Sequence, residues 1–206
     1  MNFPYRFKVI FLSFLAVSIC YIDRVNISVA IIPMQEQFGW SEFQAGIILS
    51  SFYFGYMFTL IIGGYLADKY GGKKVLGYGL LIWSFFTIIT PFFAYSGLWW
   101  LILIRILMGL GEGITFPSWH AIYARWIPFN ERTRAVAFTN SGIAAGTLFG
   151  YVVAALIIAK YSWEWVFYLF GILGIFWYFF WNESVTSFPE NNKNLSAQEL
   201  KLIKNQ

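Results

Sequence analysis

The feature that most constrains this chain is a long apolar segment that has charged residues inside it. Residues 98–122 read LWWLILIRILMGLGEGITFPSWHAI, which is long and apolar enough to cross a bilayer as one helix. The segment nevertheless contains Arg105 and Glu112, although a charge at the centre of a membrane costs about 3 kcal/mol on insertion scales. Seven residues make about two helical turns, so both side chains project from one face. Such charges commonly mark a transport pathway, and the alternative is an Arg–Glu pair that only locks the bundle.

The composition excludes most soluble classes. Hydrophobic residues make up 59% of the chain and charged residues 12%, against about 25% charged residues in a typical soluble domain. Because the apolar residues are spread along the chain, we predict an all-α integral membrane protein whose partner is the lipid bilayer. The net charge of +4 does not indicate nucleic-acid binding, because the basic residues fall in short loops. Cys20 is the only cysteine, so we expect no internal disulfide, no metal site and no cofactor.

Hydropathy predicts six membrane spans. They cover residues 7–32, 43–66, 75–94, 98–122, 134–159 and 165–181. Glycine, proline and serine are expected to mark the joints, at Pro33, Gly39, Gly71, Gly72, Pro91, Gly97, Pro128 and Ser162.

The orientation follows from the basic residues in the short loops. One set of helix ends carries Arg6, Lys8, Lys69, Lys73, Lys74, Arg125, Arg132 and Arg134, and the opposite set carries only Lys160. The basic set is predicted to be cytoplasmic, which places both termini in the cytoplasm. Tryptophans are expected to form interfacial belts, with Trp40, Trp99, Trp100 and Trp163 outside and Trp119, Trp126 and Trp181 inside.

The first span contains a second group of polar residues, in the segment CYIDRVNISVAI. Asp23 and Arg24 are predicted to lie at a depth similar to that of Arg105 and Glu112. Neighbouring residues point about 100° apart, so Asp23 and Arg24 cannot both face one cavity. We expect Arg24 to face the substrate and Asp23 to support it or to carry a proton. A pair of guanidinium groups suits a carboxylate or phosphate, and the alternative is two neutralised ion pairs with no ligand.

Other polar residues in the spans are weaker candidates. Asn26, Tyr56 and Asn140 could line a substrate cavity, although hydrogen bonding between helices explains them equally well. His120 lies about 80° round from Glu112 on the same predicted helix, where packing and proton transfer are both reasonable. A repeated small-residue pattern in the fifth span predicts the close approach of another helix, at Gly142, Gly146 and Gly150.

The loop after the second span, GGYLADKYGGKK, resembles the signature G-x-L-A-D-x-x-G-x-[KR]-[KR] of the major facilitator superfamily. The matching residues are Gly64, Leu66, Ala67, Asp68, Gly71, Lys73 and Lys74, whereas Gly72 stands where the family has a basic residue. Residues 21–31, 105–120, 126–134 and 165–177 further resemble the anion:cation symporter branch. That branch includes sialic-acid, vesicular glutamate and plastid phosphate transporters and bacterial sugar-acid symporters.

The resemblance implies roles for several residues. Arg24 and Arg105 match arginines that are associated with anion binding in this branch. Glu112 matches an acid associated with proton coupling or gating, and Asp23 matches an acid implicated in protonation. His120 matches a family histidine, whereas Leu49 stands where vesicular glutamate relatives have a histidine, which weakens a glutamate assignment. The signature loop is implied to be a conformational latch, formed by Gly64, Asp68, Gly71, Lys73 and Lys74, in which Asp68 helps to hold the two transporter halves in the outward-open state.

The superfamily is built from two six-span halves around a midplane site. Residues 1–182 are predicted to form the N-terminal six-helix bundle, and residues 183–206 the start of a central cytoplasmic linker. A short amphipathic helix is expected at residues 196–204, where Ser196 and Glu199 have capping-box spacing. We therefore expect the chain to be one half of a transporter whose C-terminal half is a missing partner.

The predicted function is cation-coupled symport of an organic anion or phosphate by alternating access. The coupling ion is expected to be H⁺, with Na⁺ as the alternative. The rival interpretations are a non-transporting half protein, truncated or acting as an interaction module, and a channel. An enzyme is disfavoured because no nucleophile–base or metal-ligand spacing occurs. The short region before the first span favours a bacterial inner membrane.

Overall fold

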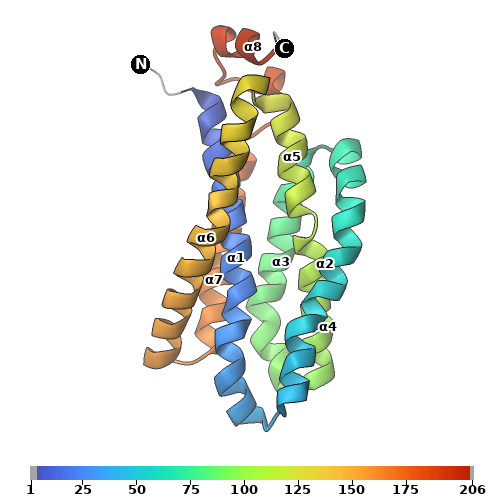
Figure 1. Ribbon diagram of the computed structural model, residues 1–206, viewed down its shortest axis with the longest axis vertical. Coiled ribbons are helices and arrows are strands. Elements are labelled where there is room, and N and C mark those ends of the chain that lie inside the picture. Colours follow the sequence, from blue (N-terminus) through green and yellow to red (C-terminus); the bar gives the residue numbers. More distant parts are fainter. Residues whose placement is uncertain (1–3, 205–206) are drawn as a thin grey trace.

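The computed structural model describes residues 4–204, which form helices and connecting turns with no strand in that range. Their bounds are α1 Tyr5–Phe38, α2 Glu42–Tyr70, α3 Gly72–Ser96, α4 Leu98–Glu112, α5 Thr115–Trp126, α6 Phe129–Lys160, α7 Glu164–Ser184, the 3₁₀ turn η1 Pro189–Asn191 and α8 Ala197–Lys204. Six spans within residues 4–204 are long and apolar enough to cross a membrane, if α4 and α5 are counted together. This confirms the predicted all-α, six-span fold. α1 begins and α8 lies at the same end of the bundle (Figure 1).

The fourth span is interrupted, so the prediction of one continuous helix over residues 98–122 is wrong. α4 ends at Glu112 and α5 begins at Thr115, with Gly113 and Ile114 between them. Pro117 explains the break, because proline has no N–H to donate and its ring clashes with the carbonyl four residues earlier, which is that of Gly113. Gly113 and Ile114 keep right-handed backbone angles, so the two helices still form one span.

Two of the expected joints are also wrong, because Pro33 and Pro91 lie inside α1 and α3. These helices continue to glycines instead. Gly39 ends α1 with a φ of 68°, and its N–H donates to the carbonyl of Gln35. A left-handed residue of this kind is a common helix terminator, and glycine adopts it without a steric penalty.

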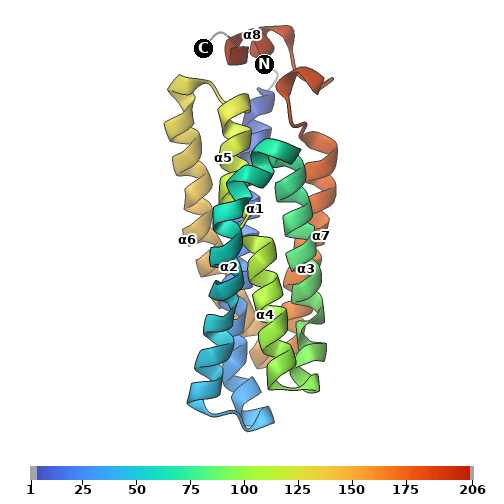
Figure 2. The ribbon, with the colours of Figure 1, turned by 90° about the vertical axis from the view of Figure 1, so that its right-hand side faces the viewer.

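α1 packs against α6 and α7, α2 packs against α4, and α3 packs against α4 and α7 (Figures 1 and 2). The predicted small-residue pattern of α6 does face α1. A Cβ atom added to Gly142 would lie 2.7 Å from the carbonyl oxygen of Phe14, and one added to Gly146 would lie 2.2 Å from that of Ser18. The missing side chains therefore permit a close helix crossing, as the pattern predicts.

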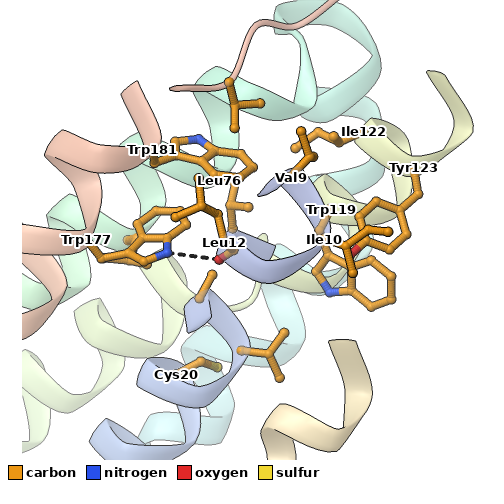
Figure 3. Packing of buried hydrophobic residues seen from close by; sticks show 14 of the residues in the cluster. Val9, Ile10, Leu12, Cys20, Leu76, Trp119, Ile122, Tyr123, Trp177 and Trp181 are labelled. Carbon is orange, nitrogen blue, oxygen red and sulfur yellow. Dashed lines mark hydrogen bonds between the residues drawn. The ribbon is translucent and has the colours of Figure 1, made fainter. Parts of the chain in front are cut away.

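The prediction of tryptophan belts is wrong for four of its residues. Trp119, Trp126 and Trp181 are completely buried, and Trp163 is 3% exposed. Burial is possible because three of the four indole N–H groups find acceptors inside the protein: Trp126 donates to the Thr186 carbonyl, Trp181 to the Lys73 carbonyl and Trp163 to the Gln37 side chain. Figure 3 shows Trp119 and Trp181 packed around the first part of α1, where Trp177 donates to the Leu12 carbonyl at 2.9 Å.

The tail folds back on the bundle through Glu199. α8 lies across the end of the bundle at which α1 begins (Figure 2). The Ser196 hydroxyl accepts the Glu199 N–H at 3.2 Å, as the capping-box spacing predicts. The Glu199 carboxylate, however, accepts the Tyr5 and Arg6 N–H groups at 2.9 and 3.0 Å and pairs with the Arg6 guanidinium. Arg6 also pairs with Glu131 at 2.7 Å, so one arginine joins α1, α6 and α8.

Candidate functional site

An ion pair between α1 and α4 forms the centre of the candidate site. The Arg24 guanidinium donates from Nε to Glu112 Oε1 at 3.0 Å and makes a second contact to the same oxygen through Nη2. Cys20, one turn earlier on α1, donates its thiol to Glu112 Oε1 at 3.0 Å. The side chain of Glu112 is 1% exposed and that of Arg24 is 16% exposed. The prediction that Arg24 lies at a depth similar to that of the charged residues of the fourth span is therefore confirmed.

Aromatic rings surround the Arg24 guanidinium. Its Cζ atom lies 4.7 Å from the ring centroid of Tyr21, 4.8 Å from that of Tyr56 and 5.4 Å from that of Phe52. Rings at such distances attract a cation through their quadrupoles. Tyr56 therefore lies beside Arg24, and its role in binding substrate stays a prediction.

Arg105 is buried and differs from Arg24 in its partners. It is 2% exposed, and its Cζ lies 5.1 Å from the Phe52 ring centroid. Its Nη1 contacts the Met108 sulfur at 3.8 Å, whereas its Nε has no hydrogen-bond partner within residues 4–204. No carboxylate in that part of the chain lies within 4.0 Å of this guanidinium. The alternative of an Arg105–Glu112 pair is therefore wrong, because Glu112 pairs with Arg24 on the neighbouring helix.

Asp23 faces away from Arg24, as the helical geometry predicts. It is completely buried, and its Oδ2 accepts the indole N–H of Trp83 on α3 at 2.9 Å. Its Oδ1 atom and both polar atoms of the Asn26 side chain have no hydrogen-bond partner in the described part of the chain. Unsatisfied buried polar groups each lower the stability of the fold by about 1–3 kcal/mol. Several of them near the charged residues would therefore not be retained for stability alone.

Two predicted residues do not join this group. His120 lies on α5, beyond the helix break, and its ring stacks on Trp119 with centroids 3.7 Å apart. The angle of 80° from Glu112 does not apply, because it assumed a continuous helix. Asn140 lies on α6 and has no hydrogen bond to Arg24, Arg105 or Glu112 among the residues that the structure describes.

The latch segment spans the turn between α2 and α3. Gly71 has a φ of 88°, a conformation that favours glycine. Lys73 donates to the Asn182 carbonyl at 2.8 Å, which ties the start of α3 to the end of α7. Asp68 and Lys74 are exposed, and a Cβ atom added to Gly64 would meet open space.

Sequence reasoning missed three residues of the site. Phe52 lies against both arginines, Trp83 binds Asp23, and Cys20 donates to Glu112. The spacing of four residues between Cys20 and Arg24 places them on one helix face, so it could have identified Cys20. Phe52 and Trp83 lie among many other aromatic residues, and nothing in their spacing distinguishes them.

The arrangement brings two cations together with two acids in a buried region. An anion entering it would compete with Glu112 for the donors of Arg24, because a guanidinium binds carboxylates and phosphates through the same N–H groups. The geometry therefore defines a multi-pass helical membrane protein with a buried charged centre, which is the type of site found in transporters.

Comparison with known proteins identifies the family. Residues 13–205 match the family model described as Major Facilitator Superfamily. The chain belongs to the major facilitator superfamily, which consists of transporters and not enzymes. The solved structure of the proton:xylose symporter XylE bound to 6-bromo-6-deoxy-D-glucose has a TM-score of 0.81 over 97% of this chain and 50% of that chain. At 18% identity, this likeness supports the fold alone.

The relatives include plant chloroplast proteins. The chain is 43% identical over 202 residues to "Ascorbate transporter, chloroplastic" of Arabidopsis thaliana, covering 98% of this chain and 37% of the relative. It is 42% identical to "Sodium-dependent phosphate transport protein 1, chloroplastic" of the same organism, covering 98% of this chain and 40% of the relative. The chain thus spans about two-fifths of the length of these relatives. Their chloroplast location gives no support to the expected bacterial inner membrane.

Proposed function

We propose that this chain contributes one wall of a secondary active transporter that carries a small anion, an organic anion or phosphate, in symport with a cation. The proposal rests above all on Arg105, a buried guanidinium with no acid partner within the described residues and with an unpaired Nε. Removing a partner from a buried charge is strongly destabilising, so an arginine in this state is suited to gain a partner from a bound anion. The ascorbate and phosphate named in the two relatives support the same substrate class.

Coupling is proposed to work through competition for Arg24. While Glu112 is ionised, it holds the Arg24 donors in an ion pair. Protonation of Glu112 would weaken that pair and free the Arg24 guanidinium to bind the anion beside Arg105. Cation entry and anion entry would then favour each other, which is the requirement for symport. H⁺ is the proposed coupling ion, and the sodium dependence named in one relative keeps Na⁺ as the alternative.

Alternating access requires a second wall, which in this fold comes from a second six-helix half. We propose that the exposed Asp68 and Lys74 face that half as a latch, and that both chain termini are cytoplasmic. The intact mass of the protein from its native membrane tests the first point. A species well above 23.8 kDa is expected, and a native species of 23.8 kDa with no anion uptake would favour the non-transporting alternative.

Replacing Arg105 by lysine tests the anion site. Arg105→Lys keeps the charge but loses the planar fork, so uptake of ascorbate or phosphate into proteoliposomes should fall by about tenfold or more. Lys201→Arg is the control, because Lys201 is exposed on α8 and its substitution also keeps the charge. Wild-type uptake by Arg105→Lys would refute the anion-binding role, and uptake without saturation would indicate a channel.

Replacing Glu112 by glutamine tests the coupling separately. In Glu112→Gln, accumulation driven by a pH gradient should be lost, whereas exchange of labelled for unlabelled anion should persist because it needs no net proton movement. Repeating the assay with a Na⁺ gradient distinguishes the two ions. Intact accumulation in Glu112→Gln under both gradients would refute the coupling mechanism, but it would not contradict the anion-binding role of Arg105.

A further inference from the structure

An apolar groove runs along the surface of the bundle between α1, α6 and α7. Its volume is about 720 Å³, and its lining includes Phe11, Ser18, Ala145 and Trp177. Two of its polar groups are occupied, since the Ser18 hydroxyl donates to the Phe14 carbonyl and the Trp177 indole donates to the Leu12 carbonyl, and the charged group in the lining is Lys8. The groove therefore offers an occupant apolar contact and almost no hydrogen bonding.

Lys8 stands where this groove meets a second one. The second groove, of about 740 Å³, lies between the starts of α1 and α6 and is lined by Lys8, Phe11, Glu131 and Arg134 among others. Both Lys8 and Arg134 are exposed, and neither has an ion-pair partner among residues 4–204. Glu131 is already paired with Arg6, so the rim of the grooves is positively charged.

We infer that these grooves form a binding site for one anionic phospholipid. The phosphate of its headgroup lies between Lys8 and Arg134, and an acyl chain lies along the apolar groove toward Ala145. The combination of a cationic rim and an apolar groove of this length matches a charged amphiphile. An extended peptide is a poor occupant, because its backbone N–H and C=O groups would find no partners in this lining. Basic side chains between transmembrane helices commonly bind acidic headgroups in this way.

Native mass spectrometry of the purified protein tests the inference. The protein is equilibrated with vesicles of equimolar phosphatidylglycerol and phosphatidylcholine and transferred to the gas phase, where retained lipids are counted. We expect one retained phosphatidylglycerol in preference to phosphatidylcholine. Each basic residue near a membrane surface contributes about fivefold to acidic-lipid binding, so Lys8→Ala with Arg134→Ala should lower retention by about 25-fold.

The matched control removes two exposed lysines of the tail, in Lys193→Ala with Lys201→Ala. It should leave retention unchanged, and an equal loss in the control would refute a localised site. Ala145→Trp supplies an independent test, because Ala145 is exposed in the groove and a tryptophan there fills the space while keeping both cations. Phosphatidylglycerol retention should fall in this variant, and unchanged retention would refute the placement of the acyl chain.

Two further outcomes would overturn the inference. Equal retention of both lipids would mean that the groove does not recognise a charged headgroup. Cross-links formed by the variant Ala145→Cys to another segment of the protein, with no retained lipid, would mean that protein covers the groove.

Discussion

The ion pair between Arg24 and Glu112 leads to a quantitative prediction about stability. At the 3.0 Å separation of Arg24 Nε and Glu112 Oε1, two unit charges attract by about 5.5 kcal/mol at an effective dielectric constant near 20. The exposed fractions of the two side chains, 16% and 1%, show that most of the hydration of both groups is lost, which offsets part of this attraction. We therefore expect a net coupling energy of about 3 kcal/mol.

A double-mutant cycle measures this coupling energy. The variants are Arg24→Met, Glu112→Gln and their combination, and the free energy of unfolding is followed by circular dichroism in mixed detergent micelles. The contacts of Arg24 with the Tyr21, Phe52 and Tyr56 rings are lost with or without Glu112, so to first order they cancel in the cycle. The result isolates the ion pair.

The same cycle on Glu190 and Lys204 is the matched control. This pair is 2.9 Å apart, but its side chains are 42% and 53% exposed, so its coupling should be below about 1 kcal/mol. If the Arg24–Glu112 coupling were also below about 0.5 kcal/mol, the pair would behave as a solvated surface contact. The reasoning from burial, and with it the proposed competition between Glu112 and an anion, would then be refuted.

Two further predictions concern packing. Gly146→Ala should lower the free energy of unfolding by several kcal/mol, because the added methyl group would meet a backbone carbonyl of α1 at 2.2 Å. Gly46→Ala, where the methyl group meets open space, should instead be neutral or stabilise by about 1 kcal/mol, and equal effects would contradict the close crossing. Glu199→Gln should accelerate amide hydrogen exchange in α8 by about 10- to 100-fold, because charged hydrogen bonds contribute about 1.5–3 kcal/mol. Glu183→Gln is its control, because Glu183 is exposed near the end of α7, and unchanged exchange in Glu199→Gln would show that α8 is held by other contacts.

The helix boundaries show which parts of the fold can be predicted from the local sequence. Each expected span lies inside or close to an observed one, because the length of an apolar segment is a property of the chain alone. The errors arise at prolines. Pro33 and Pro91 were expected to end helices and do not, whereas Pro117 interrupts the fourth span where continuity was expected. Whether a proline ends a helix depends on what replaces the lost hydrogen bond, and neighbouring helices decide that.

The burial of the tryptophan side chains could not be predicted from the local sequence either. Their amphipathic rings favour a membrane interface, yet Trp126 and Trp181 are buried because carbonyl groups of distant segments accept their N–H groups. No pattern along the chain records those acceptors.

By itself, the sequence determined that the protein is a six-span helical membrane protein and that charges lie within its first and fourth spans. It also determined that α6 has a row of glycines that allows another helix to pack closely against it. These properties follow from the hydropathy, charge and side-chain size of consecutive residues. Only the tertiary structure decided that Glu112 binds Arg24 and not Arg105, that Trp83 holds Asp23, and that Glu199 binds the start of α1. Such pairings depend on the relative rotation and depth of separate helices, which are set by packing across the bundle and not by spacing along any one helix.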